Sequence, residues 1–188
     1  MQLDGKIIAP TSREDWDSGL LQWLDFTGLS GLTIQGKGVI DGQGDVWWQD
    51  SGEMVQALRV SDSKGVTVTG LTIQNSQQAH LKFDNCEEVE VYEITINSPG
   101  NSPNTDGIHV QNSQQVSIHD NKIGCGDDCI SIQTGSSRIN ITDVTCGPSH
   151  GISIGGLGKD STTACVSDVT VSDCTITESD NGVRIKTW

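Results

Sequence analysis

Short apolar triplets recur along this sequence at a nearly constant interval, and this repeat limits the possible fold more than any other feature. The first and third residues of each triplet are aliphatic or aromatic, and successive triplets begin 23, 27, 22, 22 and 31 residues apart. The triplets are Leu58-Arg59-Val60, Leu81-Lys82-Phe83, Ile108-His109-Val110, Ile130-Ser131-Ile132, Ile152-Ser153-Ile154 and Val183-Arg184-Ile185. A fixed period of about 20–50 residues indicates a repeat architecture.

Two further short strands are expected within each repeat. A second triplet follows eight or nine residues after the first, as in Val66-Thr67-Val68 and Ile139-Asn140-Ile141. A third follows it, as in Leu71-Thr72-Ile73, and Gly, Asn, Ser and Asp between the strands favour turns. Three strands per repeat predict an all-β parallel β-helix of about six to seven coils.

No composition break divides the chain, so we expect a single domain over residues 1–188. An antiparallel β-sandwich is the alternative fold, but it fits a self-similar repeat less well. The longest interval contains Gly155–Cys165, which we interpret as a loop insertion.

The formal charge is -14, with 25 acidic residues against 11 Lys and Arg. This excess of acid argues against nucleic acid or an anionic membrane as a partner. No apolar run reaches the ~18 residues that suggest a membrane span. Residues 1–6 contain no apolar segment of the kind found in signal peptides, so we expect none within this chain.

Six cysteines fit neither a zinc-finger spacing nor a CxxC redox site. Cys129 and Cys146 fall in adjacent coils, which predicts a disulfide between them and an oxidising compartment. Buried free thiols are the alternative. Asn140-Ile141-Thr142 is a glycosylation sequon, which has meaning only in a secreted protein.

Stacking of the coils brings residues about 22 positions apart to neighbouring strands. Ile108, Ile130, Ile152 and Val183 then form one inward column, with Ile185 also expected to be buried, and alternation turns the residues between them outward. One face gathers Asp106, Asp127, Asp128, His150, Arg184 and Lys186.

Three adjacent carboxylates repel one another, so one of them should have a raised pKa and hold a proton. An acid beside a carboxylate base is what glycoside hydrolysis requires. Asp residues that merely cap turns are the alternative.

Four motifs in this order resemble those of the polygalacturonases, glycoside hydrolase family 28. They are Asn104-Thr105-Asp106-Gly107, Gly126-Asp127-Asp128, Ser149-His150-Gly151 and Arg184-Ile185-Lys186. The longer strings around them look most like plant members. The resemblance extends from about Leu3 to Trp188 and implies a single-stranded right-handed parallel β-helix of the pectin-lyase-like kind.

The resemblance also implies an inverting hydrolase that cuts α-1,4 bonds of polygalacturonate (pectin) by general acid/base catalysis. By motif match, Asp127 resembles the general acid, and Asp106 and Asp128 the pair that deprotonates the water. His150 is similar to the histidine that tunes the acid. Arg184 and Lys186 resemble the cations that bind galacturonate carboxylates.

Asn104 is expected to support the substrate or the Asp cluster. His109 faces outward beside the cluster and is a candidate substrate contact. No metal and no cofactor is implied. The expected setting is a secreted monomer in the cell wall.

The motifs depart from the family at Ser149, where glycine is usual, and at Cys125, which is an unusual residue before Gly126. Family members continue for several coils beyond the position of Trp188 and begin with further sequence. We therefore expect a chain truncated at its C-terminus and missing N-terminal sequence.

Several other residues were considered for the site. His80 and His119 are expected in turns or on the surface. The tryptophans Trp16, Trp23, Trp47 and Trp48 are expected to pack the N-terminal coils, and Lys159 is a candidate subsite cation.

Two alternative functions stay open. One is a catalytically inactive fragment that binds pectin. The other is a calcium-dependent pectate lyase, in which Asp106 and Asp128 would bind Ca²⁺. Endo against exo action, and galacturonan against rhamnogalacturonan or xylogalacturonan, are not decided by the sequence.

Overall fold

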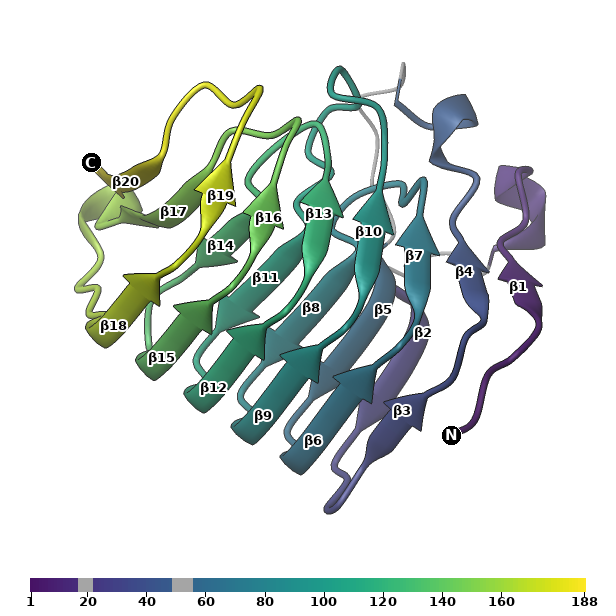
Figure 1. The fold of residues 1–188 in the computed structure, drawn as a ribbon, viewed down its shortest axis with the longest axis horizontal. Coiled ribbons are helices and arrows are strands. Elements are labelled where there is room, and N and C mark those ends of the chain that lie inside the picture. The colour runs from purple at the N-terminus through teal and green to yellow at the C-terminus, as the bar shows by residue number, and fades with distance from the viewer. Residues whose placement is uncertain (17–21, 49–55) are drawn as a thin grey trace.

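The computed structural model describes residues 1–16, 22–48 and 56–188, and it consists almost entirely of short parallel strands (Figure 1). The strands form three sheets of seven, seven and six strands. Consecutive strands in the chain enter consecutive sheets, so each full coil adds one strand to each sheet. The fold is the predicted right-handed parallel β-helix. In the described part of the chain, the only helical elements are three 3₁₀ turns: η1 (Arg13–Asp15), η2 (Gly44–Val46) and η3 (Lys159–Ser161).

We number the sheets in the order in which each coil visits them. Sheet 1 contains β2 (Gln22–Thr27), β5 (Gln56–Ser61), β8 (Leu81–Asp84), β11 (Ile108–Gln111), β14 (Ile130–Ile132), β17 (Ile152–Leu157) and β20 (Val183–Thr187). Sheet 2 contains β3 (Thr33–Gln35), β6 (Lys64–Thr69), β9 (Glu87–Tyr92), β12 (Gln114–His119), β15 (Ser137–Thr142) and β18 (Ser167–Ser172). Sheet 3 contains β1 (Lys6–Ile8), β4 (Val39–Asp41), β7 (Thr72–Gln74), β10 (Thr95–Asn97), β13 (Lys122–Gly124), β16 (Thr145–Cys146) and β19 (Thr175–Ile176).

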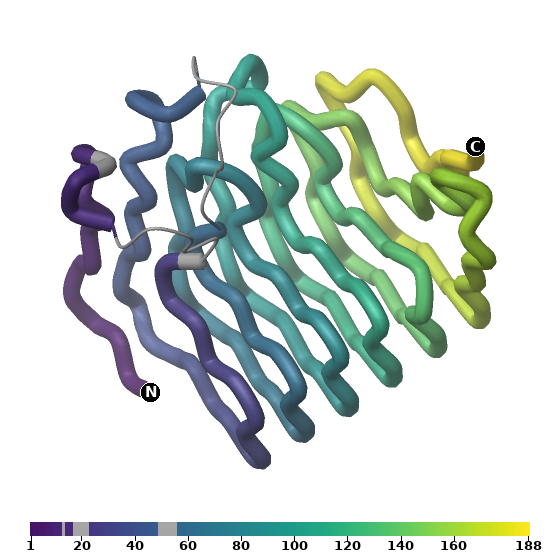
Figure 2. Tube along the Cα trace, turned by 180° about the vertical axis from the view of Figure 1, so that it is seen from behind, coloured from purple at the N-terminus to yellow at the C-terminus, as the bar shows by residue number. Residues whose placement is uncertain are grey.

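The coils stack one on the next (Figure 2). The core lies between the three sheets and is made of inward columns of side chains. In sheet 1, Ile108 pairs with Ile130 and Ile130 with Ile152, the register expected from the period. All three side chains are fully buried. Burying one such side chain contributes about 1.5–3 kcal/mol. The columns therefore account for much of the stability and leave the outward positions of each strand free for function.

The inward column does not stay buried in the last coil. Val183 pairs with Ile152 as expected, but Val183 is 54% exposed and Ile185 is 69% exposed. The expected burial of these two residues is wrong. The reason is that β20 pairs with β17 on one side only, and no strand of the described chain covers its other side.

The turns between sheets 1 and 2 are held by polar side chains with left-handed backbone conformations. Asp62, Asn85 and Asn112 occupy equivalent positions with φ of 50°, 55° and 50°. Asn85 Nδ2 donates to Asp62 Oδ1 at 2.6 Å, which ties one turn to the next. At the following turn stands Gly135, with φ of 80°, where an added Cβ would lie 2.3 Å from Asn112 Oδ1. Only glycine fits there without displacing the asparagine.

The segment expected to be a loop insertion is partly strand. β17 extends to Leu157, and η3 follows it before the chain reaches β18. Lys159 Nζ lies over the ring of Trp188, 5.7 Å from the ring centroid. This partner explains why Lys159 is not among the residues that line the cleft described below.

The tryptophans pack in the early coils, as expected. Trp16 and Trp47 meet edge to face with ring centroids 6.2 Å apart, and Trp23 packs against the core. Trp48 Nε1 donates to the carbonyl oxygen of Ser76 at 3.0 Å.

A disulfide joins Cys129 and Cys146, as predicted, and ties β16 of sheet 3 to the residue before β14 of sheet 1. Over the described residues, no helix has both the length and the apolar character needed to cross a membrane.

Candidate active site

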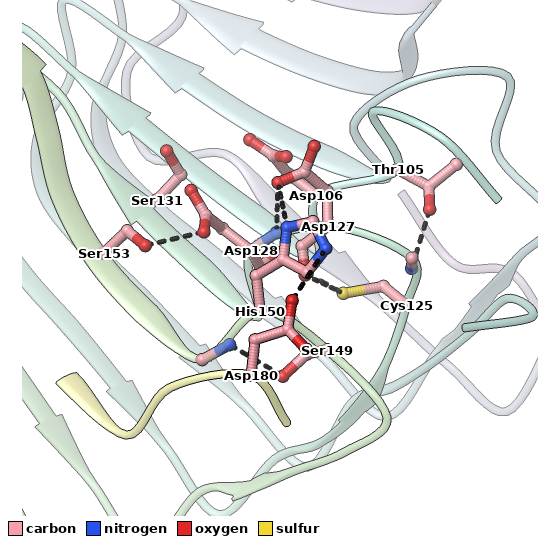
Figure 3. Close-up of polar contacts among 12 residues, drawn as sticks. Thr105, Asp106, Cys125, Asp127, Asp128, Ser131, Ser149, His150, Ser153 and Asp180 are labelled. Atoms are coloured by element: carbon pink, nitrogen blue, oxygen red, sulfur yellow. Dashed lines mark hydrogen bonds and ion pairs between the residues drawn. The ribbon is translucent and has the colours of Figure 1, made fainter. Parts of the chain in front are cut away.

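The three aspartates of the predicted cluster lie in the turns that lead from sheet 3 into sheet 1. Asp106 precedes β11, Asp127 and Asp128 precede β14, and His150 precedes β17. Backbone hydrogen bonds continue from coil to coil through these turns. His150 N donates to Asp127 O at 2.7 Å, and Gly107 N donates to Asp128 O at 2.9 Å. The period of the chain therefore places the carboxylates side by side (Figure 3).

Small residues let these turns pack closely. At Gly126 an added Cβ would lie 1.9 Å from the carbonyl oxygen of Ser102. The hydroxyl of Thr105 accepts from Gly126 N at 2.9 Å and donates to Ser102 O at 2.9 Å. Thr105 thus joins the turn that carries Asp106 to the turn that carries Asp127 and Asp128.

The cluster opens into a cleft of about 410 Å³ on the outer face of sheet 1. The lining residues are mostly polar and come from several coils: Gln56, Gln78, Ala79, Lys82, Asn104, Asp106, His109, Gln111, Asp127, Asp128, Ser131, Gln133, Thr134, Gly155, Gly156 and Lys186. Six of the eight predicted site residues are in this set. The other two do not line the cleft. His150 contacts Asp127, and Arg184 binds Asp128.

Asp128 is the most strongly bound carboxylate of the cluster. Its Oδ1 accepts from Ser153 Oγ at 2.6 Å and from Arg184 Nη2 at 2.8 Å. Its Oδ2 accepts from Lys186 Nζ at 2.6 Å. Burial alone would raise the pKa of this carboxyl, but these three donors together outweigh burial and hold its pKa below the ordinary value. Asp128 is therefore anionic at neutral pH.

Asp106 has the opposite environment. Burial is the main reason that its pKa is raised, and the charges of Asp127 and Asp128 add to the effect. A hydrogen bond with His109 Nδ1, 3.2 Å from Asp106 Oδ2, lowers it in part. Asp106 and Asp128 therefore differ: the environment of Asp106 favours a bound proton, and that of Asp128 favours the anion.

Asp127 lies in a chain of polar contacts that runs through His150. Asp127 Oδ1 accepts from the backbone N–H of Asp128 at 2.8 Å and lies 3.1 Å from His150 Nδ1. His150 Nε2 lies 3.6 Å from Asp180 Oδ2 on the next coil (Figure 3). Within the described residues, Asp127 Oδ2 has no hydrogen-bond partner, so this oxygen is the one free to meet a substrate in the cleft.

His80 lies in the turn before β8, as one of the two expected positions has it, but it is not a surface residue. It is fully buried, with Nδ1 2.8 Å from the carbonyl oxygen of Asp106 and Nε2 2.7 Å from Ser98 Oγ. Since a carbonyl only accepts, Nδ1 carries the hydrogen and Nε2 accepts from the serine hydroxyl. Burial lowers the pKa of His80 to about 4, so the ring is neutral and fixes the backbone of Asp106. His119 is partly exposed on sheet 2, where its ring stacks on Tyr92.

The two departures from the family motifs have local partners. Ser149 Oγ accepts from Gly151 N at 3.0 Å and shares a hydrogen bond with Ser179 Oγ. The thiol of Cys125 is buried and contacts the carbonyl oxygen of Asp127 at 3.4 Å. Burial raises the pKa of this thiol to about 12, so Cys125 is an inert part of the core.

The sequence analysis did not predict a role for Ser153 or for Lys82. Ser153 binds Asp128 directly, and Lys82 lines the cleft one coil before His109. Both belong to the outward column that contains His109, Ser131 and Arg184. Extending that column by one coil toward the N-terminus would have found Lys82.

Comparison with known proteins agrees with this geometry. The sequence model of glycosyl hydrolases family 28 matches residues 1–188. The chain belongs to this family. The family predicted from the four motifs is thereby confirmed.

Plant proteins are among its relatives. A polygalacturonase of Cryptomeria japonica is 43% identical over 199 residues, which cover 100% of this chain and 38% of that protein. Polygalacturonase-2 of Solanum lycopersicum is 42% identical over 197 residues, covering 100% of this chain and 43% of that protein. This chain spans about two fifths of the length of these curated relatives.

Solved structures share the fold. The crystal structure of an endo-xylogalacturonan hydrolase from Aspergillus tubingensis superposes with a TM-score of 0.91 at 26% identity, over 100% of this chain and 53% of that chain.

Proposed function

We propose that this chain carries the acid/base centre of a polygalacturonase, which hydrolyses α-1,4 bonds of polygalacturonate. The observation that carries the proposal is the pair formed by Asp127 and Asp128 in one cleft. Asp128 is held anionic by Arg184 and Lys186, while Asp127 turns an unpartnered oxygen to the cleft. The family and the names of the plant relatives support the substrate class.

In the proposed reaction, Asp127 donates its proton to the glycosidic oxygen as the bond to the anomeric carbon breaks. Asp106 and Asp128 hold a water molecule, and the anionic Asp128 accepts its proton as the water oxygen attacks the anomeric carbon. Asp106 and Asp128 can each accept one hydrogen of that water, which orients its lone pair for attack. A proton from solvent can reach Asp127 again through His150, whose Nδ1 lies 3.1 Å from Asp127 Oδ1.

Inversion is part of the proposal on the strength of the family resemblance. An oxygen of Asp127 and an oxygen of Asp128 lie within 4.8 Å of each other. This is shorter than the ~6.5–9.5 Å typical of inverting enzymes and near the ~5–5.5 Å of retaining ones. The water must therefore be held beside the pair rather than between its members. Nuclear magnetic resonance of the first-formed anomer decides between inversion and retention.

The direct test is release of new reducing ends from polygalacturonate by the purified chain. Asp127→Asn should lower the rate by about 10²–10⁴-fold, the usual contribution of a positioned acid. Substrate binding should change much less. Asp143→Asn, at an exposed turn, is the matched control. Near-full turnover in Asp127→Asn would show that another group is the acid, and no turnover in the parent would support the pectin-binding alternative.

A calcium-dependent lyase is the second candidate, because Asp127, Asp128 and His150 offer three close ligand atoms. Two features weigh against it. Ca²⁺ prefers oxygen ligands, and a histidine nitrogen is a poor substitute. Both oxygens of Asp128 are already bound to cations, which would repel a third. Unsaturated, ultraviolet-absorbing products and loss of activity with chelator would favour the lyase.

We further propose that the protein works as a secreted monomer in the cell wall. The Cys129–Cys146 disulfide supports this setting, since such bonds form and persist in oxidising compartments.

A further inference from the structure

Lys82 is a cation of the cleft that pairs with no carboxylate of the described residues. Its side chain points outward from β8 and lines the cleft. Among the described residues, Lys82 takes part in no hydrogen bond through its side chain and no ion pair, although it is only partly exposed. Arg184 and Lys186, the cations expected to bind substrate, are both engaged by Asp128. The free positive charge of this cleft is therefore Lys82.

The anionic groups nearest to Lys82 are already bound elsewhere. Asp84, on the same strand, accepts from Arg59 Nη2 at 3.2 Å and from Asn112 Nδ2 at 3.2 Å. Asp106 is paired with His109. Burial lowers the pKa of Lys82, and the charges of Asp84 and Asp106 offset this only in part. An anion arriving from solvent would supply the partner that the protein does not.

His109 supplies a second unused group beside Lys82. The two residues are direct partners in the pairing of β8 with β11, and both face outward. His109 Nε2 is buried and has no hydrogen-bond partner within the described chain. When Asp106 holds its proton and donates it to His109 Nδ1, the neutral ring carries its own hydrogen on Nε2, which is then a donor. Lys82 and this nitrogen thus lie on adjacent strands, and no acceptor among the described residues pairs with either.

We propose that Lys82 and His109 form a subsite for the carboxylate of a uronic-acid residue, next to the bond-cleaving cluster on its N-terminal side. The subsite rests on the proposed function for the identity of the polymer. Adjacent strands are about 4.8 Å apart, so Lys82 lies ~10 Å along sheet 1 from the strand that follows Asp128. The bound carboxylate then belongs to a sugar one or two units from the scissile bond.

The subsite also resolves a charge problem. Arg184 and Lys186 both pair with Asp128, within a chain whose formal charge is -14. Lys82 adds a positive charge that no carboxylate of the described residues pairs with. An anionic polymer can then enter a cleft that would otherwise repel it.

The test separates binding from cleavage. Dissociation constants are measured for the parent, Lys82→Gln, Lys82→Arg and Lys122→Gln, with oligogalacturonates and with fully methyl-esterified oligomers of the same length. Lys122 is exposed on β13 of sheet 3 and serves as the matched control. Lys82→Gln should weaken oligogalacturonate binding by about tenfold or more, as for loss of a charge-assisted hydrogen bond, and leave the ester unchanged. Lys82→Arg should restore most of the difference.

Each outcome is decisive. An equal loss on acid and ester, or no loss in Lys82→Gln, overturns the subsite. A parent that binds no oligogalacturonate overturns it as well. Reducing-end release is measured on the same proteins, and a parent that binds with Lys82-dependent selectivity but releases no ends would contradict the proposed hydrolysis while supporting the subsite.

Discussion

Lys186 and Asp128 are 58 residues apart in the chain and are joined by an ion pair of 2.6 Å between Nζ and Oδ2. Asp128 is 2% exposed, so its charge depends on partners from the protein rather than on water. Lys186, expected to bind substrate, therefore supports the charge of Asp128, the proposed base.

Loss of this support should affect every substrate. Lys186→Met leaves Asp128 with Arg184 and Ser153, and its carboxyl pKa should rise. The acid limb of the activity profile should then move to higher pH, on galacturonan and on partly esterified pectin alike. The cost in unfolding free energy should stay below the about 3–5 kcal/mol of a broken, fully buried pair, because Arg184 still holds Oδ1. A pH profile and a thermal melt check both points, and a loss confined to the acidic substrate would contradict them.

Asp106→Asn should lower the activity and raise the stability of the protein at neutral pH. The folded protein raises the pKa of Asp106, chiefly by burial, so it binds this proton more tightly than the unfolded chain does. The stabilisation from this group is present at low pH and is lost as the pH rises through the folded pKa. An amide has no such loss, so the variant should melt higher than the parent at neutral pH. Its turnover should fall by about 10²–10⁴-fold. Asp173→Asn, at an exposed turn, should do neither.

His80 should make the fold sensitive to acid. Its pKa is about 4 in the folded protein against 6.5 for an unperturbed histidine, so the unfolded chain binds more protons between these values. Stability should fall as the pH drops from 6.5 toward 4, by an amount on the order of 3 kcal/mol from this group. Denaturant unfolding of the parent and of His80→Gln at several pH values tests this. If the variant retained the full pH dependence, other groups would be responsible for it.

The Cys129–Cys146 bond should stabilise the centre of the helix. A disulfide that closes a loop of this size contributes ~3 kcal/mol in the chain-entropy account. Replacing both cysteines by alanine should lower the unfolding free energy by about that amount. Cys165→Ser, which removes an exposed free thiol, is the control. Equal melting of the double variant and the parent would show that the bond is not formed in solution.

The sequence was sufficient for the fold and for the position of the cluster, because both follow from one period. The pairing of Ile108 with Ile130 and Ile152 is a matter of counting residues. Counting also places Asp106, Asp128 and His150 at equivalent positions, with Asp127 one residue earlier. It does not show which atoms meet. Arg184 and Lys186 are long side chains, and only their conformations direct both onto Asp128.

The repeat period also did not predict which side chains are buried at positions where neighbouring residues determine the burial. His80 stands one position before an inward residue, as Gly107 does in the next coil, and nothing in the spacing showed that its ring would turn inward. The exposure of Val183 depends on whether another strand lies over β20.

The position of both cations on β20 has a consequence for how the proposed activity would be lost. Arg184 and Lys186 hold Asp128 from one strand, so the charge of this buried carboxylate depends on the pairing of β20 with β17. Local opening of that pairing would remove both cations together and leave the charge of Asp128 buried with Ser153 alone. Loss of one strand pairing would thus disable the proposed base while the rest of the helix stayed intact. Amide hydrogen exchange in Val183–Thr187 would then follow the decay of activity more closely than the global melting of the molecule does.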